Sequence, residues 1–273
     1  MSEKILYICQ EISPYIAGET PLGISTKTLT TSMQERGNEI RTFMPRYGLI
    51  NERRHQLHEV IRLSGMNVII CDNDHQLIIK VASLQPSRLQ VYFIDNDDFF
   101  TRKATIIDCD GNEFEDNGDR ALFFARGVIE TVKKLRWQPE IVHCHGWFSA
   151  IAPLYIKHLF SDDPLFANTK IVVSLYDDAF SSTFSEEYKE KIKQESPGIN
   201  NTNLENIDSD SYQNLMKLVM DFADGIVLES EGVASELKEY ALASGKLVLD
   251  HAQYAEQTEY MDAYQNFYNE IKG

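Results

Sequence analysis

Residues 4–45, KILYICQEISPYIAGETPLGISTKTLTTSMQERGNEIRTFMP, contain the pattern that decides the fold. Residues 4–9 form a short apolar run of the kind found in buried strands. A loop with Gly and Pro leads to a helix over residues 24–36, which Gly37 ends just after its last turn. Residues 39–44 form a second strand. Strand, helix and strand make a βαβ unit, which predicts a parallel sheet with right-handed connections.

Downstream of this unit, four apolar runs follow one another with turn residues between them and no helix. They predict β-hairpins that extend or edge the sheet. Apolar spacing then predicts a helix over residues 120–135, after which strands and helices alternate again. The hairpin strands are residues 60–63, 67–71, 77–84 and 89–95; the later strands are 141–145, 170–176, 225–228 and 246–249; the later helices are 148–159, 212–222, 230–240 and 254–271.

This alternation predicts an α/β fold, a Rossmann-like, doubly wound, mostly parallel sheet with a β-hairpin extension. We expect one domain over residues 1–250 and a C-terminal helix within residues 251–273 that packs back on it. Residues 181–211 are polar, so we expect a flexible surface insertion there. Such folds bind ligands beyond the carboxyl ends of their strands. Those ends lie near residues 10–23, 45–48, 145–147, 176–179 and 229–232.

The charge and the cysteines argue against several classes of function. A nucleic-acid partner requires clustered Lys and Arg, whereas the formal net charge is −16; solubility is the simplest explanation of that charge. The four cysteines form no C-x-x-C pair, so neither a zinc site nor a thioredoxin motif is predicted. The sequence shows no secretory signal and no apolar run near the ~20 residues of a membrane span. We therefore expect a cytoplasmic protein with no membrane contact.

Two histidines, His143 and His145, lie on one predicted strand and face the same side of it. Two imidazoles on one face could bind a metal, but no third ligand is visible, and we expect no metal. His145 could instead contact a ligand, since Gly146 lets the backbone come close. The simpler interpretation is one core histidine and one surface histidine. Asp177 and Asp178 are likewise either a binding pair or a turn feature.

The loop of residues 18–23 lies where dinucleotide-binding folds place their phosphate loop. It does not spell G-x-G-x-x-G. Glu19 would repel a phosphate, and Pro21 removes one backbone N–H donor. The residues alone therefore predict an α/β domain with a weakened ligand face.

Three longer motifs resemble those of bacterial glycogen synthases and plant starch synthases. The first contains Phe99, Arg102, Asp110-Gly111, Phe114, Asp116-Asn117, Arg120 and Phe124, and is similar to their F-x-R…D-G-x-x-[FY]-x-D-N-x-x-R-F stretch. The second, WQPEIVHCHGW over residues 137–147, is similar to W-x-P-D-[IV]-[IV]-H-x-H-D-W. The third, NLMK over residues 214–217 followed by FAD over 222–224, resembles N-[FL]-[LM]-K…[YF]-A-D. The matches keep their order and spacing from residue 4 to about residue 240.

The resemblance implies the N-terminal half of a two-domain glycosyltransferase of the GT-B fold. That family transfers glucose from ADP-glucose to the end of an α-1,4-glucan, with retention and without a metal or other cofactor. His145 matches a histidine that the family uses near the transferred sugar, and is the candidate catalytic residue. The candidate substrate-binding residues are Asp116, Asn117, Trp147, Asn214 and Lys217.

Several positions depart from the family pattern. The family's Lys-x-Gly-Gly-Leu loop, whose Lys meets the donor phosphates, should fall near residues 17–23, where no Lys is present. Its H-D-W-H has become HGWF over residues 145–148, and its H-N has become Tyr176-Asp177. The resemblance further implies that the second domain, with most of the nucleotide site and a catalytic Glu, is absent. The ends would then be rejoined near residues 245–250 and closed by the family's own last helix.

Two hypotheses of function follow. One is a glycogen/starch synthase-like transferase in glycogen metabolism, with ADP-glucose and α-1,4-glucan as ligands. The other is a non-catalytic relative, inactive or incomplete alone, that binds a glucan, a nucleotide or a synthase subunit. The missing Lys favours the second, because stabilising the leaving diphosphate is usually the largest contribution to catalysis.

An exposed aromatic surface is also expected on the cleft side, over residues 10–23, Tyr47, Trp147, Phe148 and Phe180. Such a surface usually marks an interface, which would make the chain a homo-oligomer or the partner of a synthase chain. Alternatively, the closing helix with Tyr260, Tyr264 and Tyr268 folds over these aromatic residues and covers them.

Overall fold

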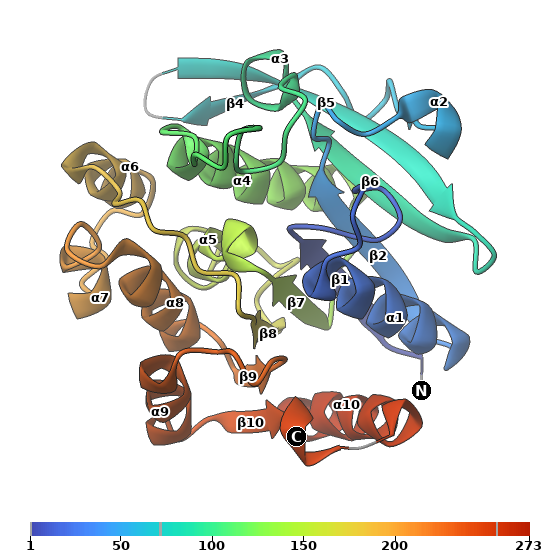
Figure 1. The fold of residues 1–273 in the computed structure, drawn as a ribbon, viewed down its shortest axis with the longest axis vertical. Coiled ribbons are helices and arrows are strands. Elements are labelled where there is room, and N and C mark those ends of the chain that lie inside the picture. Colours follow the sequence, from blue (N-terminus) through green and yellow to red (C-terminus); the bar gives the residue numbers. More distant parts are fainter. Residues whose placement is uncertain (1, 71–72, 255) are drawn as a thin grey trace.

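A computed structural model describes residues 2–70, 73–254 and 256–273, and it shows one twisted sheet with helices on both sides (Figure 1). Cys71, in one of the predicted hairpin strands, lies outside these residues. The strands are β1 (Lys4–Cys9), β2 (Glu39–Pro45), β3 (His58–Glu59), β4 (Met66–Ile70), β5 (Asn73–Leu84), β6 (Leu89–Asp95), β7 (Ile141–His145), β8 (Lys170–Leu175), β9 (Gly225–Leu228) and β10 (Leu247–Asp250).

Helices connect most of the parallel strands, and short 3₁₀ or π turns, labelled η, interrupt them. The helices and turns are α1 (Pro21–Glu35), α2 (Glu52–His55), α3 (Asp97–Phe100), α4 (Asn117–Leu135), η1 (Trp147–Ser149), α5 (Ile151–Leu154), η2 (Tyr155–Leu159), α6 (Glu186–Glu195), α7 (Thr202–Glu205), α8 (Ser211–Asp221), α9 (Ser235–Ala243), η3 (His251–Gln253) and α10 (Gln257–Lys272).

The strand β1 lies inside the sheet, whose order is β10-β9-β8-β7-β1-β2-β6-β5-β3, with β4 paired to β5. All neighbours from β10 to β6 are parallel, whereas β5 is antiparallel to β6, β3 and β4. Every residue of β7 is buried, as are five of the six residues of β1. Burial on both faces is typical of a parallel sheet covered by helices. The predicted α/β fold, with its mostly parallel sheet and its hairpin extension, is confirmed.

The first helix begins three residues earlier than predicted, at Pro21. The Oγ1 atom of Thr20 caps it by accepting a hydrogen bond from the Gly23 N–H at 3.0 Å. Pro21 then occupies the first helical position, where its missing N–H has no cost. Thr20 also donates to Glu11 Oε2 at 2.6 Å, so the cap ties the helix start to the end of β1.

The single helix predicted over residues 148–159 is wrong. This stretch forms the 3₁₀ turn η1, the short helix α5 and the π turn η2. Pro153 lies in the first turn of α5, where backbone N–H groups have no partner within the helix. Around Pro153 the chain therefore forms three short helical segments of different type instead of one continuous α-helix.

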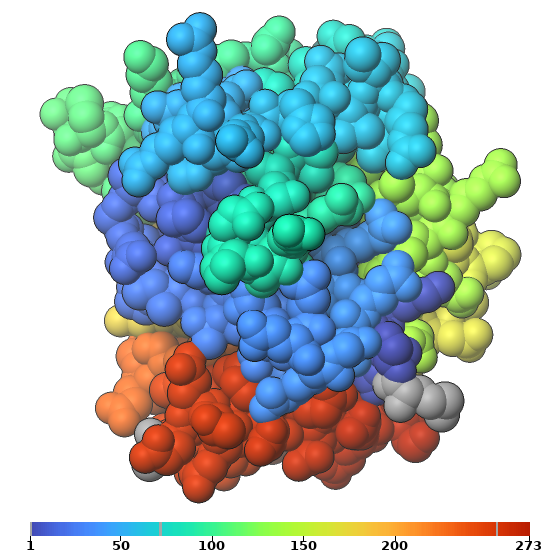
Figure 2. All heavy atoms as spheres, turned by 90° about the vertical axis from the view of Figure 1, so that its right-hand side faces the viewer, coloured from blue at the N-terminus to red at the C-terminus, as the bar shows by residue number. Residues whose placement is uncertain are grey.

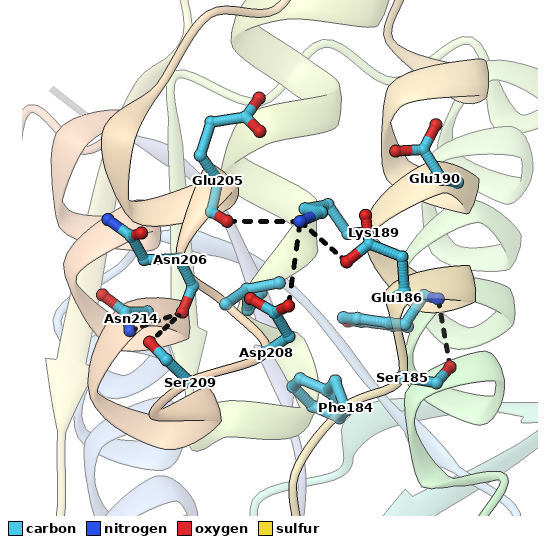
Figure 3. Close-up of polar contacts among 12 residues, drawn as sticks. Phe184, Ser185, Glu186, Lys189, Glu190, Glu205, Asn206, Asp208, Ser209 and Asn214 are labelled. Atoms are coloured by element: carbon cyan, nitrogen blue, oxygen red, sulfur yellow. Dashed lines mark hydrogen bonds and ion pairs between the residues drawn. The ribbon is translucent and has the colours of Figure 1, made fainter.

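The polar residues 181–211 contain two helices, α6 and α7, which the sequence analysis does not predict. They bury Tyr188, Ile192 and Leu204, so this segment adds to the core although its overall composition is polar. Figure 3 shows Lys189 of α6 between Glu186, whose Oε2 lies 2.9 Å from Nζ, and the backbone oxygen of Glu205, at 3.3 Å. The hydrogen bond to Glu186 raises the pKa of Lys189. The flexibility of this segment stays a prediction.

The closing helix α10 packs against β10 and α1. Figure 1 shows it beside the edge of the sheet formed by β9 and β10. Its inner face, with Tyr264, Phe267 and Tyr268, is buried. A Cβ atom at Gly225 of β9 would lie 2.9 Å from Phe267 Cζ, so glycine is the residue that leaves room for this ring.

We expect the substitution Phe267→Ala to lower the free energy of unfolding by about 3–4 kcal/mol, because it empties a buried aromatic position. Urea unfolding measures this change. Glu270→Ala, at an exposed position on the same helix, is the control and should stay within about 0.5 kcal/mol of the parent. A loss below about 1 kcal/mol for Phe267→Ala would show that α10 does not belong to the cooperative core.

Candidate functional site

A cavity of about 830 Å³ lies at the carboxyl ends of β1, β8 and β9, where folds of this type bind ligands. The start of α1 forms one wall, and side chains from η3 and from the first half of α10 form another. The lining residues are Gln10, Glu11, Thr20, Pro21, Leu22, Ile24, Ser25, Thr28, Tyr176, Asp177, Asp178, Glu229, Ser230, His251, Tyr254, Glu256, Gln257, Tyr260 and Met261.

Two carboxylates at the cavity, Glu11 and Asp178, are held by hydrogen bonds from the start of α1, from η1 and from α8. Glu11 Oε2 accepts from Thr20, while Asp178 accepts from the Trp147 N–H at 3.0 Å and from the Tyr212 hydroxyl at 2.7 Å. Burial raises the pKa of both carboxyls, and the hydrogen bonds from Thr20 and Tyr212 oppose that shift. Both side chains are thus fixed in place.

A third carboxylate, Glu229, follows β9 and is nearly buried. It accepts hydrogen bonds from Tyr260 at 2.8 Å, from Tyr264, from Ser174 at 3.0 Å and from Ser25 at 3.3 Å. These donors come from α10, β8 and α1. Desolvation, and then the charge of Glu229, raise the pKa of the Tyr260 hydroxyl, which therefore stays a donor. Glu229 thus joins three walls of the cavity.

The candidate catalytic residue His145 is fully buried and does not line the cavity. Its Nδ1 lies 2.8 Å from the hydroxyl oxygen of Tyr176, and Tyr176 does line the cavity. Its Nε2 has no hydrogen-bond partner within the described residues. Burial lowers the pKa of His145 to about 3. His145 is therefore a neutral histidine, and the side chain of Tyr176 lies between it and the cavity.

His143, on the same face of β7, is also buried and reaches Glu229 through a different side chain, Ser174. Its Nε2 lies 2.7 Å from Ser174 Oγ and its Nδ1 lies 2.6 Å from the Tyr268 hydroxyl, which in turn lies 3.1 Å from the Tyr7 hydroxyl. Burial keeps the pKa of His143 well below its usual range. Within the described residues, no three His, Cys, Asp or Glu side chains are placed to hold a metal ion.

Asp116 and Asn117, candidate substrate-binding residues, lie at the start of α4 and outside the cavity. Asp116 pairs with Arg102 at 2.9 Å. Asn117 donates to the Ile106 carbonyl at 2.7 Å and accepts from the buried Arg120 at 2.6 Å. These contacts hold the loop before α4.

The candidates on α8, Asn214 and Lys217, also lie outside the cavity. Asn214 donates to the backbone oxygen of Asn206 at 2.9 Å (Figure 3). It also donates to the backbone oxygen of Asp210 at 3.0 Å. Lys217 pairs with Glu236 of α9. The structure does not bring the five candidate substrate-binding residues together at this cavity, and their binding role stays a prediction.

The expected exposed aromatic surface is wrong. Tyr47, Trp147, Phe148 and Phe180 are all buried, and Trp147 is only 1% exposed. The ring of Trp147 packs against Phe180 at 4.6 Å and Phe184 at 6.4 Å between centroids. The segment after β8, rather than the closing helix, supplies these contacts. The reason for expecting self-association through this surface is therefore removed.

Sequence reasoning does not single out Glu11, Glu229 or Tyr260 as site residues. Their positions could have indicated Glu11 and Glu229, because Glu11 lies two residues after the predicted strand 4–9 and Glu229 directly follows the predicted strand 225–228. Within the described part of the chain, no helix is long and apolar enough to cross a membrane.

Comparison with known proteins identifies the family. Residues 4–251 match the family model described as starch synthase catalytic domain. The chain belongs to that family. Glycogen synthases of Chlorobium limicola and Chlorobaculum tepidum are 34% and 35% identical over 174 residues, or 63% of this chain. The match covers 35% and 36% of those two proteins, so the chain spans about a third of their length.

Solved structures show the same fold as this member of the starch synthase catalytic domain family. The catalytic domain of starch synthase IV from Arabidopsis thaliana, bound to ADP and acarbose, aligns with a TM-score of 0.71 at 17% identity, over 92% of this chain and 51% of that one. A sucrose-phosphate synthase structure from Thermosynechococcus elongatus aligns with a TM-score of 0.51 at 9% identity, over 98% and 99% of the two chains. The predicted family resemblance is confirmed.

The low pKa of His145 predicts how stability changes with pH. Between pH 6.5 and pH 5 the unfolded chain takes up a proton at this histidine and the folded chain does not, so acidification favours unfolding. Urea unfolding at several pH values should show that His145→Gln loses less stability over this window, by up to ~1.4 kcal/mol per pH unit. His58→Gln, at an exposed position, is the control. Equal slopes for the parent and His145→Gln would contradict the buried neutral state.

Proposed function

We propose that this domain binds a neutral α-1,4-glucan segment in the cavity and does not by itself transfer glucose from ADP-glucose. One observation carries the proposal, namely the charge of the cavity wall. Within the described residues, no Lys or Arg lines the cavity. Five carboxylates do, namely those of Glu11, Asp177, Asp178, Glu229 and Glu256.

A nucleotide diphosphate is a poor fit to this wall. Transfer of a glucosyl group from ADP-glucose leaves a diphosphate whose charge has to be stabilised by cationic groups or free backbone donors. The start of α1 offers little of either, because Pro21 has no N–H and the Gly23 N–H already donates to Thr20. The carboxylates that remain would repel the phosphates.

A sugar chain suits the same wall better. Carboxylate oxygens accept hydrogen bonds from hydroxyl groups, and Glu11 and Asp178 are held in fixed positions at the cavity. Tyr254 and Tyr260, whose ring centroids lie 5.6 Å apart, add aromatic surface on which the apolar face of a glucose unit can lie. Family membership supports a glucan as the ligand.

Transfer from ADP-glucose is the second candidate function, and membership of the starch synthase catalytic domain family is the observation that favours it. A partner synthase subunit that contributes cationic groups to the cavity would reconcile the two. We also propose a cytoplasmic location, consistent with the free thiols of Cys9, Cys109 and Cys144.

Calorimetric titration separates the two functions. We expect binding of maltoheptaose with a dissociation constant of about 1 mM or below, no binding of ADP-glucose or ADP under the same conditions, and no incorporation of labelled glucose into glycogen. Tight binding of ADP-glucose, or glucose transfer by the purified chain, would contradict the proposal and support the second candidate.

The lining of the cavity predicts that Tyr254 contributes to the affinity for the glucan. Tyr254→Ala removes an aromatic wall and should weaken maltoheptaose binding about tenfold, equivalent to 1.4 kcal/mol. Tyr240→Ala is the matched control, because Tyr240 is also a partly exposed tyrosine but lies on α9 away from the cavity. Equal affinities for both variants would place the glucan elsewhere.

A further inference from the structure

A second hollow lies between the end of α1 and the outer face of α10. It measures about 530 Å³ and is lined by Arg36, Asn38, Asp262, Gln265, Asn266 and Asn269. We call it the amide groove. It shares no lining residue with the cavity at the strand ends. Figure 2 shows the two parts of the chain that form it, with α10 in red lying against the N-terminal region in blue.

The amide groove is polar but carries no net charge. Its charged residues, Arg36 and Asp262, neutralise one another in an ion pair of 2.5 Å. Its other four residues carry amide side chains. An amide offers both a donor and an acceptor without charge. The groove is therefore neutral, although the chain has a formal net charge of −16.

The floor of the amide groove is fixed and its rim is free. Asn38 is nearly buried; its Oδ1 accepts from the Glu3 N–H at 3.1 Å and its Nδ2 donates to Gln265 Oε1 at 3.0 Å. Within the described residues, no hydrogen bond occupies the side-chain amides of Asn266 and Asn269. Two amides are thus available to a ligand above a third that is held in place.

Helix stability does not explain these amides. Positions 262, 265, 266 and 269 share one face of α10, because residues three and four apart are neighbours on a helix. On an exposed face, Asn stabilises a helix less than Ala, Lys or Glu does. The opposite face, with Phe267 and Tyr268, is buried against the domain. On the amide face, Asp262 and Gln265 contact Arg36 and Asn38, whereas Asn266 and Asn269 are exposed.

We propose that the amide groove is a second site for a neutral oligosaccharide, where Asn266 and Asn269 bind hydroxyl groups of an α-glucan. Neutral donors and acceptors together fit a polyol better than an ion, and the acidic chain repels polyanions. The choice of α-glucan rests on the function proposed above. With the cavity at the strand ends, this groove would give the domain two contacts to one polymer, which raises its affinity for glycogen through avidity.

The first test is a titration of the ¹⁵N-labelled chain with maltoheptaose, observed at the side-chain NH₂ signals of Asn266 and Asn269. Loss of each signal in N266A and N269A assigns it. We expect saturable shifts of both signals, unchanged in Tyr254→Ala. Signals that do not move, that move equally with glycerol at the same hydroxyl concentration, or that respond to a short peptide instead would overturn the proposal.

The two proposals fail separately in this titration. Shifts at cavity residues alone would support glucan binding there and overturn the amide groove, whereas shifts at Asn266 and Asn269 alone would do the reverse. As a second readout, we expect the double variant N266A/N269A to lose about fivefold in glycogen affinity on native gels. Glu270→Ala, an exposed position on the same helix outside the groove, should match the parent.

Discussion

The structure around the cavity depends on one carboxylate, Glu229. It receives hydrogen bonds from two tyrosines of α10, from Ser174 of β8 and from Ser25 of α1. A carboxylate so nearly buried is costly unless such donors surround it, and hydrogen bonds to a charged group contribute about 1.5–3 kcal/mol each. The same bonds hold α10 on the sheet. Tyr260 and Met261 of α10 complete the cavity wall, and the outer face of α10 forms the amide groove.

The carboxylate of Glu229 also determines which atoms donate and which accept in the hydrogen-bond network that runs from Ser174 to Tyr7. Since Ser174 donates to Glu229, the Ser174 oxygen is left to accept from His143 Nε2–H, and His143 Nδ1 then accepts from Tyr268. Tyr7 in turn donates to Tyr268. This assignment follows from the network of partners and agrees with the low pKa that burial gives His143. The His143 side of this network is therefore neutral, and Glu229 is the carboxylate to which it connects.

The regular core of the fold and the location of the cavity at the carboxyl ends of the strands were predictable from the sequence, whereas the individual residues of the site were not. The βαβ unit and the helix after residue 117 have strong local periodicity, and the family motifs span them. Glu229 has no local signal, because its partners Ser25 and Tyr260 lie far away in the chain. The contribution of residues 181–211 to the core could not be predicted, because Tyr188 and Ile192 are isolated among polar residues in the sequence. The burial of Trp147 could not be recognised either, because the rings that pack against it, Phe180 and Phe184, come from the chain after β8, more than 30 residues away.

Hydrogen exchange of α10 in Glu229→Gln tests most directly whether this carboxylate holds the helix and, with it, the cavity. Loss of about 1.4–3 kcal/mol of local stability should speed amide exchange across residues 257–272 by about 10- to 100-fold, because such amides exchange through local opening. Exchange in β1 and β2 should stay as in the parent. Glu231→Gln, two residues away and exposed, is the matched control. Equal exchange of α10 in the two variants would contradict the account.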